Sequence, residues 1–349
     1  MKQIDIADAL NISTSTVSRV LGRNDTRSIS EDLKHRIITM AIENGIKIKT
    51  KKYGILIGSF RGEQPDDPFF GEIINHAAKA FQEMSYYRCF HCTAPELEKM
   101  SDAEMIEHYG QLDGVIIIAM TRRSIIDRIA KLTSNIVHIG EVFAFNEISN
   151  LYTELDDYPY DQITFDSYNL IIQCVEYLVS LGRKKIIFVS MVNENIQRNA
   201  RTAGYLEGMS RTGLAGRVKI VFSENFGFDG GYNIANEIYK KTDFDAVICH
   251  SDQIALGLME KLISLGAKIP DDIMVIGFND IAMASCKDPP LTTVRVDTKG
   301  IGYLSAMIIN ARVEKLLSAP VMIRTKLELV KRKSTGDAGY QKHSQNSLT

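Results

Sequence analysis

Long apolar segments are missing from this sequence. It contains no tryptophan and no run of eighteen consecutive apolar residues, and its first residues, Met1 to Asp5, lead into a mixed polar and apolar pattern. A membrane-spanning helix needs about 18 or more apolar residues, and a secretion signal needs an apolar core near the N-terminus. These absences predict a protein without a membrane segment that stays in the cytoplasm.

Cysteine is scarce, with five residues in a chain of 349. An odd number of cysteines in a long chain without a signal peptide argues against a disulfide framework and suits a reducing compartment. Cys89 and Cys92 have a metal-like spacing, but no second pair of ligands is nearby and the segment is typical of a buried strand. We therefore expect neither a disulfide framework nor a metal site.

The short motifs of common enzymes are also absent. The sequence has no G-x-G-x-x-G, no G-x-x-x-x-G-K-[ST] and no G-x-S-x-G, which cradle phosphates or present a nucleophilic serine. No nucleophile and base, and no cluster of metal ligands, have a spacing that demands chemistry. The sequence predicts a protein that is not an enzyme and uses no cofactor.

Charge is unevenly distributed although the net charge is only −2. The segment from Met1 to Lys52 has ten Lys or Arg against six Asp or Glu, a charge of +4, and the remainder carries −6. A basic head on an acidic body is typical of a nucleic-acid reader, because a local patch is enough to attract phosphates.

Three short helices are predicted in this head, at 4–10, 14–21 and 30–44, from the spacing of their apolar residues. Ser13 and Ser30 are placed to cap the second and third helices. The second helix turns hydroxyls and a guanidinium outward, a face that can hydrogen-bond to base edges and phosphates. The pattern favours a helix-turn-helix domain over residues 1–45, and a small helical bundle for protein contacts is the alternative.

The second of these helices carries a recognisable motif. The sequence I-S-T-S-T-V-S-R-V-L at 12–21, preceded by D-I-A at 5–7, resembles the head signature of the LacI/GalR family of transcriptional regulators. That resemblance implies that Thr14, Ser15 and Arg19 read bases. It also implies that Thr16, Ser18 and Asn24 contact phosphates or brace the fold.

The body, residues 53–331, alternates apolar strand candidates with helical stripes, a pattern that predicts parallel sheets with helices on both faces. About ten strand candidates exceed one doubly wound sheet, and the break at 181–183 is a natural start for a second. Ligands of such folds bind at the carboxyl ends of the strands, so two facing lobes place a ligand between them. The expected fold is therefore α/β, a three-helix head followed by a core of two lobes with doubly wound parallel sheets. The resemblance to the LacI/GalR family implies that this core is of the periplasmic-binding-protein type.

Five further motifs of the body resemble the same family in the family's order: D-P-F-F at 67–70, A-R-T-A-G-Y at 200–205, S-D-Q-I-A-L-G at 251–257, G-F-N-D at 277–280 and P-P-L-T-T-V-R at 289–295. The resemblance implies a small effector, commonly a sugar, whose contacts would be Asp67, Phe69, Phe70, Glu141, Arg201, Phe226, Ser251 and Asn279. An arginine fork and amides suit hydroxyl groups, and an aromatic ring suits a sugar face. Three of these residues have ordinary alternatives: Arg201 as a surface cation, Phe226 as a core residue and Ser251 as a helix cap.

The chain departs from the family pattern between head and body. Family members carry a hinge helix with a P-N-x-x-A-R-x-L pattern that inserts a leucine into the minor groove, whereas here only a short basic linker, 46–52, is available. We expect DNA binding that is retained but strongly dependent on salt. A long acidic and aromatic stretch at 141–160 has no assigned role, and the polar tail at 332–349 is expected to be disordered.

Together these patterns predict a cytoplasmic, homodimeric repressor that binds double-stranded operator DNA and responds to a sugar, with galactosides as the narrower candidate. The alternatives are an activator, a regulator that responds to another ligand, or a cytoplasmic sugar-binding protein whose DNA head is weakened. An Arg201→Ala variant is expected to lose the ligand response and keep DNA binding.

Overall fold

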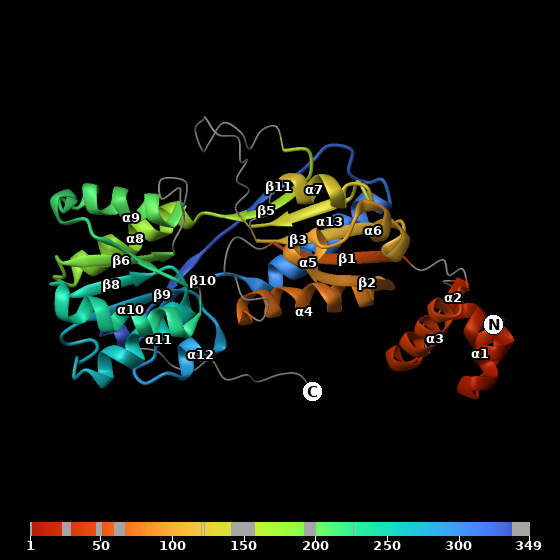
Figure 1. Cartoon of the computed structure of the whole chain (residues 1–349), viewed down its shortest axis with the longest axis horizontal. Coiled ribbons are helices and arrows are strands. Elements are labelled where there is room, and N and C mark those ends of the chain that lie inside the picture. Colours follow the sequence, from red (N-terminus) through yellow and green to blue (C-terminus); the bar gives the residue numbers. More distant parts are fainter. Residues whose placement is uncertain are drawn as a thin grey trace.

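The computed structural model describes residues 2–22, 29–46, 51–58, 67–119, 121, 123–140, 158–191, 200–225 and 227–336. It consists of three N-terminal helices followed by two α/β lobes (Figure 1). Glu141, Phe226, Asn24 and most of the 141–160 stretch lie outside the described residues. Within the described ranges, no helix is both long and apolar enough to cross a membrane.

The head contains α1 (Gln3–Leu10), α2 (Thr14–Gly22) and α3 (Glu31–Glu43). Asn11 ends α1 in the left-handed conformation, with φ 53°, and so turns the chain toward α2. The Oγ of Ser13 accepts a hydrogen bond from the Thr16 amide at 3.1 Å, the cap expected from the sequence. The helices share a small apolar core made of Ile6, Ala7, Val17, Val20, Leu21, Ile29, Ile37 and Ala41.

The first lobe is a six-stranded parallel sheet in the order β11-β5-β4-β3-β1-β2. Its strands are β1 (Lys51–Ile57), β2 (Tyr86–Thr93), β3 (Gly114–Ile118), β4 (Ile136–Ile139), β5 (Asp161–Phe165) and β11 (Met322–Thr325). One face packs on α4 (Pro68–Glu83) and α13 (Thr298–Val313). The other face packs on α5 (Ala94–Glu98), α6 (Asp102–Tyr109) and α7 (Arg123–Ile129), so the sheet is buried on both sides.

The second lobe repeats this strand order as β12-β10-β9-β8-β6-β7. Its strands are β6 (Ile186–Met191), β7 (Ile220–Ser223), β8 (Ala246–Cys249), β9 (Met274–Asn279), β10 (Thr292–Arg295) and β12 (Glu328–Val330). All pairs are parallel except β10 with β12, which is antiparallel. The helices are α8 (Ser167–Ser180), α9 (Ala200–Arg211), α10 (Phe228–Lys241), α11 (Asp252–Ser264) and α12 (Ala282–Cys286).

The chain crosses between the lobes three times, as Figure 1 shows. It leaves the first lobe after β5, returns after β10 to form α13 and β11, and crosses again to form β12. The second sheet begins with β6 at Ile186, directly after the break at 181–183 where the sequence predicts it. Helix α8, which precedes that break, already packs on α9 of the second lobe. The glycines of A-R-T-A-G-Y-L-E-G make this contact close: a Cβ at Gly204 would lie 2.4 Å from the Tyr168 carbonyl oxygen.

Two expected domain boundaries were wrong. The linker was expected to continue to residue 52, but β1 begins at Lys51 and pairs with β2 there. The tail was expected to be disordered from residue 332, but Arg332 is 1 % exposed and a short 3-10 helix, η3 (Lys333–Thr335), packs beside β9 and β10. Residues 337–349 of the expected tail lie outside the described residues.

Candidate functional site

The exposed face of α2 carries the residues expected to contact DNA. Thr14, Ser15 and Ser18 are exposed, while Arg19 is half-buried beside Val20 and Val17 of the head core. The Oγ of Ser13 lies 2.8 Å from both the Ser15 and Thr16 hydroxyl oxygens, so Thr16 also braces the start of the helix. Hydroxyls gathered at a helix N-terminus, where free backbone N–H groups point outward, are suited to bind phosphate oxygens.

Arg201 lies at the carboxyl edge of the second sheet. It is the second residue of α9, its guanidinium carbon is 3.7 Å from the centre of the Phe278 ring, and its Nη1 donates a hydrogen bond to the His250 carbonyl oxygen. His250 follows β8 and Phe278 belongs to β9. The Arg201 side chain is thus held at the ends of two strands. An ordinary surface cation, the alternative considered for Arg201, would not need such contacts.

Ser251 lies two residues after β8, and Asn279 is the last residue of β9. The Ser251 Oγ accepts a hydrogen bond from the Ile254 amide at 3.3 Å, so this residue does cap α11. Asn279 and the next residue, Asp280, both adopt positive φ angles, 117° and 59°, which non-glycine residues seldom do. Asn279 is 8 % exposed, and the described part of the chain offers its Oδ1 no hydrogen-bond partner. Strained backbone and an unsatisfied buried acceptor are typical of a binding site.

Asp252 holds this strained loop in place. Its carboxylate accepts hydrogen bonds from the Ile281 amide at 2.8 Å and from the Thr293 hydroxyl at 2.5 Å. Complete burial raises the pKa of Asp252 to about 7, although these two hydrogen bonds oppose the rise. Asp280 is held from the other side, by Arg332 at 2.6 Å and Arg295 at 2.7 Å. The S-D-Q, G-F-N-D and P-P-L-T-T-V-R motifs therefore meet in one polar network.

The first lobe contributes Asp67, which caps α4 by accepting a hydrogen bond from the Phe69 amide at 2.8 Å. Burial raises the Asp67 pKa, while the Phe69 amide and the positive charge of Arg201 lower it. The influence of Arg201 shows that these two charged groups of opposite lobes lie near each other. Phe69 is buried and Phe70 is half-buried, with their ring centres 5.6 Å apart.

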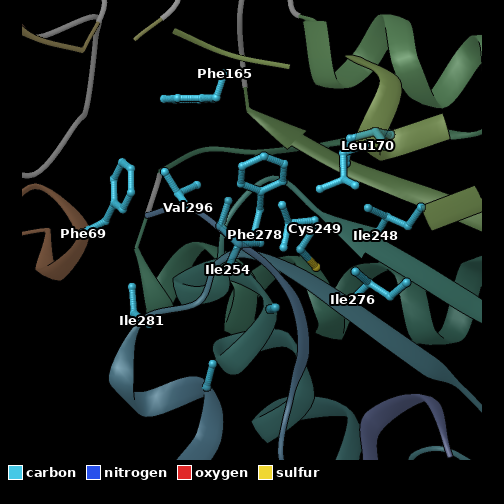
Figure 2. Packing of buried hydrophobic residues seen from close by; sticks show 14 of the residues in the cluster. Phe69, Phe165, Leu170, Ile248, Cys249, Ile254, Ile276, Phe278, Ile281 and Val296 are labelled. Carbon is cyan, nitrogen blue, oxygen red and sulfur yellow. The ribbon is translucent and has the colours of Figure 1, made fainter. Parts of the chain in front are cut away.

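Aromatic rings from both lobes surround this region. Figure 2 shows Phe69 of α4, Phe165 at the end of β5 and Phe278 at the end of β9, with Val296 between them. Sequence reasoning did not name Phe165, Phe278 or Asp252 as site residues. Phe278 and Asp252 lie inside motifs that it quoted, next to the residues it chose, so position relative to the strand end was the available signal.

The C-F-H-C segment has no metal-binding character. Burial raises the pKa of Cys89 to about 11 and that of Cys92 to about 12, which keeps both thiols protonated. Across the described ranges, no group of three or more His, Cys, Asp or Glu side chains is arranged to hold a metal ion.

Comparisons with known proteins connect these features. Residues 175–335 match the family model of a periplasmic binding protein-like domain. The chain is 26 % identical over 355 residues to the HTH-type transcriptional regulator GalR of Streptococcus thermophilus, covering 95 % of this chain and 98 % of that protein. The name of that relative is that of a transcriptional regulator, the class of protein that the motifs of the sequence predict.

Two solved structures share the fold along 96 % of this chain and 99 % of theirs. The lac repressor dimer bound to operator and the anti-inducer ONPF has a TM-score of 0.70 at 19 % identity. The transcriptional regulator CelR in complex with cellobiose has a TM-score of 0.67 at 20 % identity.

Proposed function

We propose that this chain, which belongs to the LacI/GalR family of transcriptional regulators, is a cytoplasmic homodimeric repressor released from, or held on, its operator by a sugar. The carrying observation is the strand-end cluster in which Arg201 is fixed over Phe278, beside the unsatisfied Oδ1 of Asn279. Such a cluster serves ligand binding, and the same chain carries a helix-turn-helix head.

Operator recognition is assigned to α2. Thr14, Ser15 and Arg19 would read base edges in the major groove, and Thr16, Ser18 and Asn24 would contact phosphates or brace the helix. Two heads on a two-fold dimer favour a nearly palindromic operator. Because phosphate neutralisation supplies much of the affinity, binding weakens steeply as salt is raised, and an affinity that hardly changes with salt would contradict this assignment.

The effector is assigned to the space between the two sheet edges. Arg201, Ser251 and Asn279 would hydrogen-bond to hydroxyls, with Asp67 on the opposite side, while the Phe278 and Phe165 rings would pack on the apolar face of a sugar. The cellobiose that accompanies CelR agrees with this class of ligand. Phe70, Glu141 and Phe226 complete the proposed contacts. Galactosides are the first candidates within the class, because the N-D-I sequence at 279–281 resembles that of repressors of galactoside use.

The mechanism is a population shift. The lobes adopt two arrangements, the effector binds one of them more tightly, and the separation of the two DNA heads changes with the arrangement. The second candidate function is a sugar-binding protein with a weakened DNA head. It is favoured because only four residues separate the described head from β1, and four residues are too few for a hinge helix.

The test is fluorescence anisotropy of the purified protein on labelled DNA from its own upstream region, with galactosides, other sugars and purine bases. Preference for this DNA over random sequence, changed by one sugar, supports the repressor and identifies the effector. An Arg19→Ala variant is the matched control, since it alters the head without touching the lobes. Equal affinity for both DNAs would reject the repressor in favour of the sugar-binding protein.

A further inference from the structure

The linker between head and body is fixed at its head end. Gly45 follows α3 in the left-handed conformation, with φ 67°, and the Ile46 amide donates a hydrogen bond to the Ala41 carbonyl oxygen at 2.8 Å. This six-to-one bond is a Schellman cap, and Ile46 packs on the head core as such caps require. The path of the chain is therefore determined as far as Ile46.

The linker is fixed again at its body end. The Lys51 ammonium binds the Asn310 Oδ1 at 2.9 Å and pairs with the Glu314 carboxylate, and it lies 5.1 Å from the centre of the Tyr86 ring. The Tyr86 hydroxyl also donates to the Asn310 Oδ1, at 3.2 Å. Only 13 % of the Lys51 side chain is exposed, so this clamp ties the first residue of β1 to α13.

The helix that receives Lys51 reaches back to the junction of the lobes. α13 has 16 residues, a length of about 24 Å, and its N-cap Asp297 directly follows Val296 in the aromatic region of Figure 2. It packs closely on α4, since a Cβ at Gly302 would lie 2.7 Å from the Ala77 amide nitrogen. Thr298 adds a 3.0 Å hydrogen bond to Glu72 of α4. A movement of the first lobe therefore carries Lys51 with it.

Four residues, 47–50, separate these two fixed points, and five Cα-to-Cα steps span at most about 17 Å. A tether this short transmits the displacement of its attachment point, whereas a longer flexible chain would absorb it. We propose that Lys51 is a positioning residue which, by clamping β1 to α13, makes lobe movement set the spacing of the two DNA heads. This inference rests on the proposed repressor function. It assigns to Lys51 the positioning of the DNA heads that a hinge helix would otherwise supply.

The test is selection of binding sites from a random-sequence DNA pool by the full-length wild-type protein and its variants. We expect wild type to select two half-sites at a single spacing. Lys51→Met should select several spacings. When two base pairs are inserted between the half-sites of the site that wild type selects, the affinity of wild type should fall by a factor about ten times larger than the affinity of Lys51→Met. Insertion of Gly-Ser-Gly-Ser between Thr50 and Lys51 should reproduce the effect with Lys51 intact.

Matched variants separate positioning from folding and from charge. Lys51→Arg should restore the single spacing, and Lys52→Met, which removes the same charge one residue later, should leave it unchanged. The urea midpoint of Lys51→Met should fall only slightly, because its partner Glu314 is half-exposed and stays solvated. The same single spacing for wild type, Lys51→Met and the insertion would overturn the inference. A wild-type protein that selects no site would instead overturn the repressor function and this inference with it.

Discussion

The two lobes have the same strand order but distribute their polar groups differently. At the edges that face each other, the second lobe presents Arg201, Ser251 and Asn279, whereas the described edge of the first lobe presents Asp67 and two phenylalanines. A shared topology thus carries one polar edge, which we propose hydrogen-bonds the effector, and one edge that is mostly apolar. Fold-level similarity alone does not place such chemistry.

Each lobe also buries an arginine and aspartate pair, for different purposes. In the first lobe, Arg312 of α13 binds Asp161 with two hydrogen bonds of 2.8 and 2.6 Å, at the strand end remote from the ligand region. In the second lobe, Arg332 binds Asp280, which directly follows Asn279. The first pair joins α13 to the sheet, and the second supports the strained loop.

The largest expected effect breaks the second-lobe pair. Arg332→Met leaves the buried Asp280 with Arg295 as its remaining partner, so the loss of stability should approach but stay below about 3 to 5 kcal/mol, the cost when a buried pair loses one partner. We expect a lower urea midpoint, followed by circular dichroism because the chain has no tryptophan, together with weaker effector binding. The matched Arg312→Met variant should lower stability and keep the effector affinity. Equal loss of effector affinity in both would remove the proposed difference between the pairs.

The next effect concerns the ligand alone. Arg201→Ala removes charged hydrogen bonds and should weaken effector binding by about 1.5 to 3 kcal/mol, measured by calorimetry, with operator affinity unchanged in the absence of effector. Arg211→Ala, at the exposed end of the same helix, should change neither quantity. A parallel fall in operator affinity for Arg201→Ala would show that this residue is structural.

A smaller effect distinguishes the lobes by pH. The folded-state pKa of Asp252 is raised to about 7, so its contribution to stability is lost as pH rises from about 4 to about 7. Burial lowers the pKa of His138 in β4 to about 4, so its contribution is lost as pH falls from about 6.5 to about 4. The stability differences between wild type and Asp252→Asn, and between wild type and His138→Gln, should therefore change with pH in opposite directions. Urea titrations at several pH values measure both, and slopes of the same sign would contradict the burial argument.

The smallest effect provides the baseline. Each lobe has an exposed pair four residues apart on a helix, Arg123 with Asp127 at 3.8 Å and Arg211 with Glu207 at 2.7 Å. Solvent screens such pairs, so Asp127→Asn and Glu207→Gln should leave the urea midpoint unchanged in either lobe. A measurable loss in one lobe alone would mean that surface charge also differs between them.

Much of the fold was predictable because its signals are local. Apolar periodicity located the three head helices and most of the buried strands, and Ser13 and Ser251 do cap the helices that follow them. Four strands, β5, β10, β11 and β12, were not located from the sequence. Two of them, β5 and β10, contain buried polar residues. β5 opens with Asp161 and Gln162, each 2 % exposed, and β10 with two fully buried threonines, which a hydrophobic pattern does not reveal.

The candidate site was predictable in part for the same reason. Family motifs identified Arg201 and Asn279, but nothing near them in the sequence indicated their supports. Asp252 binds a hydroxyl 41 positions away, and Arg332, taken for part of a disordered tail, binds a carboxylate 52 positions away. All of the assigned DNA and effector contacts remain predictions, and Glu141, Phe226 and Asn24 lie outside the described residues.

The sequence by itself determined the elements of this protein: the helical head with its hydroxyl face, the alternation of strands and helices, and the motifs at the strand ends. Only the tertiary structure decided that α13 returns to the first lobe, that Lys51 is clamped to it, and that Arg332 lies beneath the loop of Asn279. The physical reason is that periodicity and capping involve residues a few positions apart. Buried polar groups, in contrast, must find hydrogen-bond partners wherever the fold brings them.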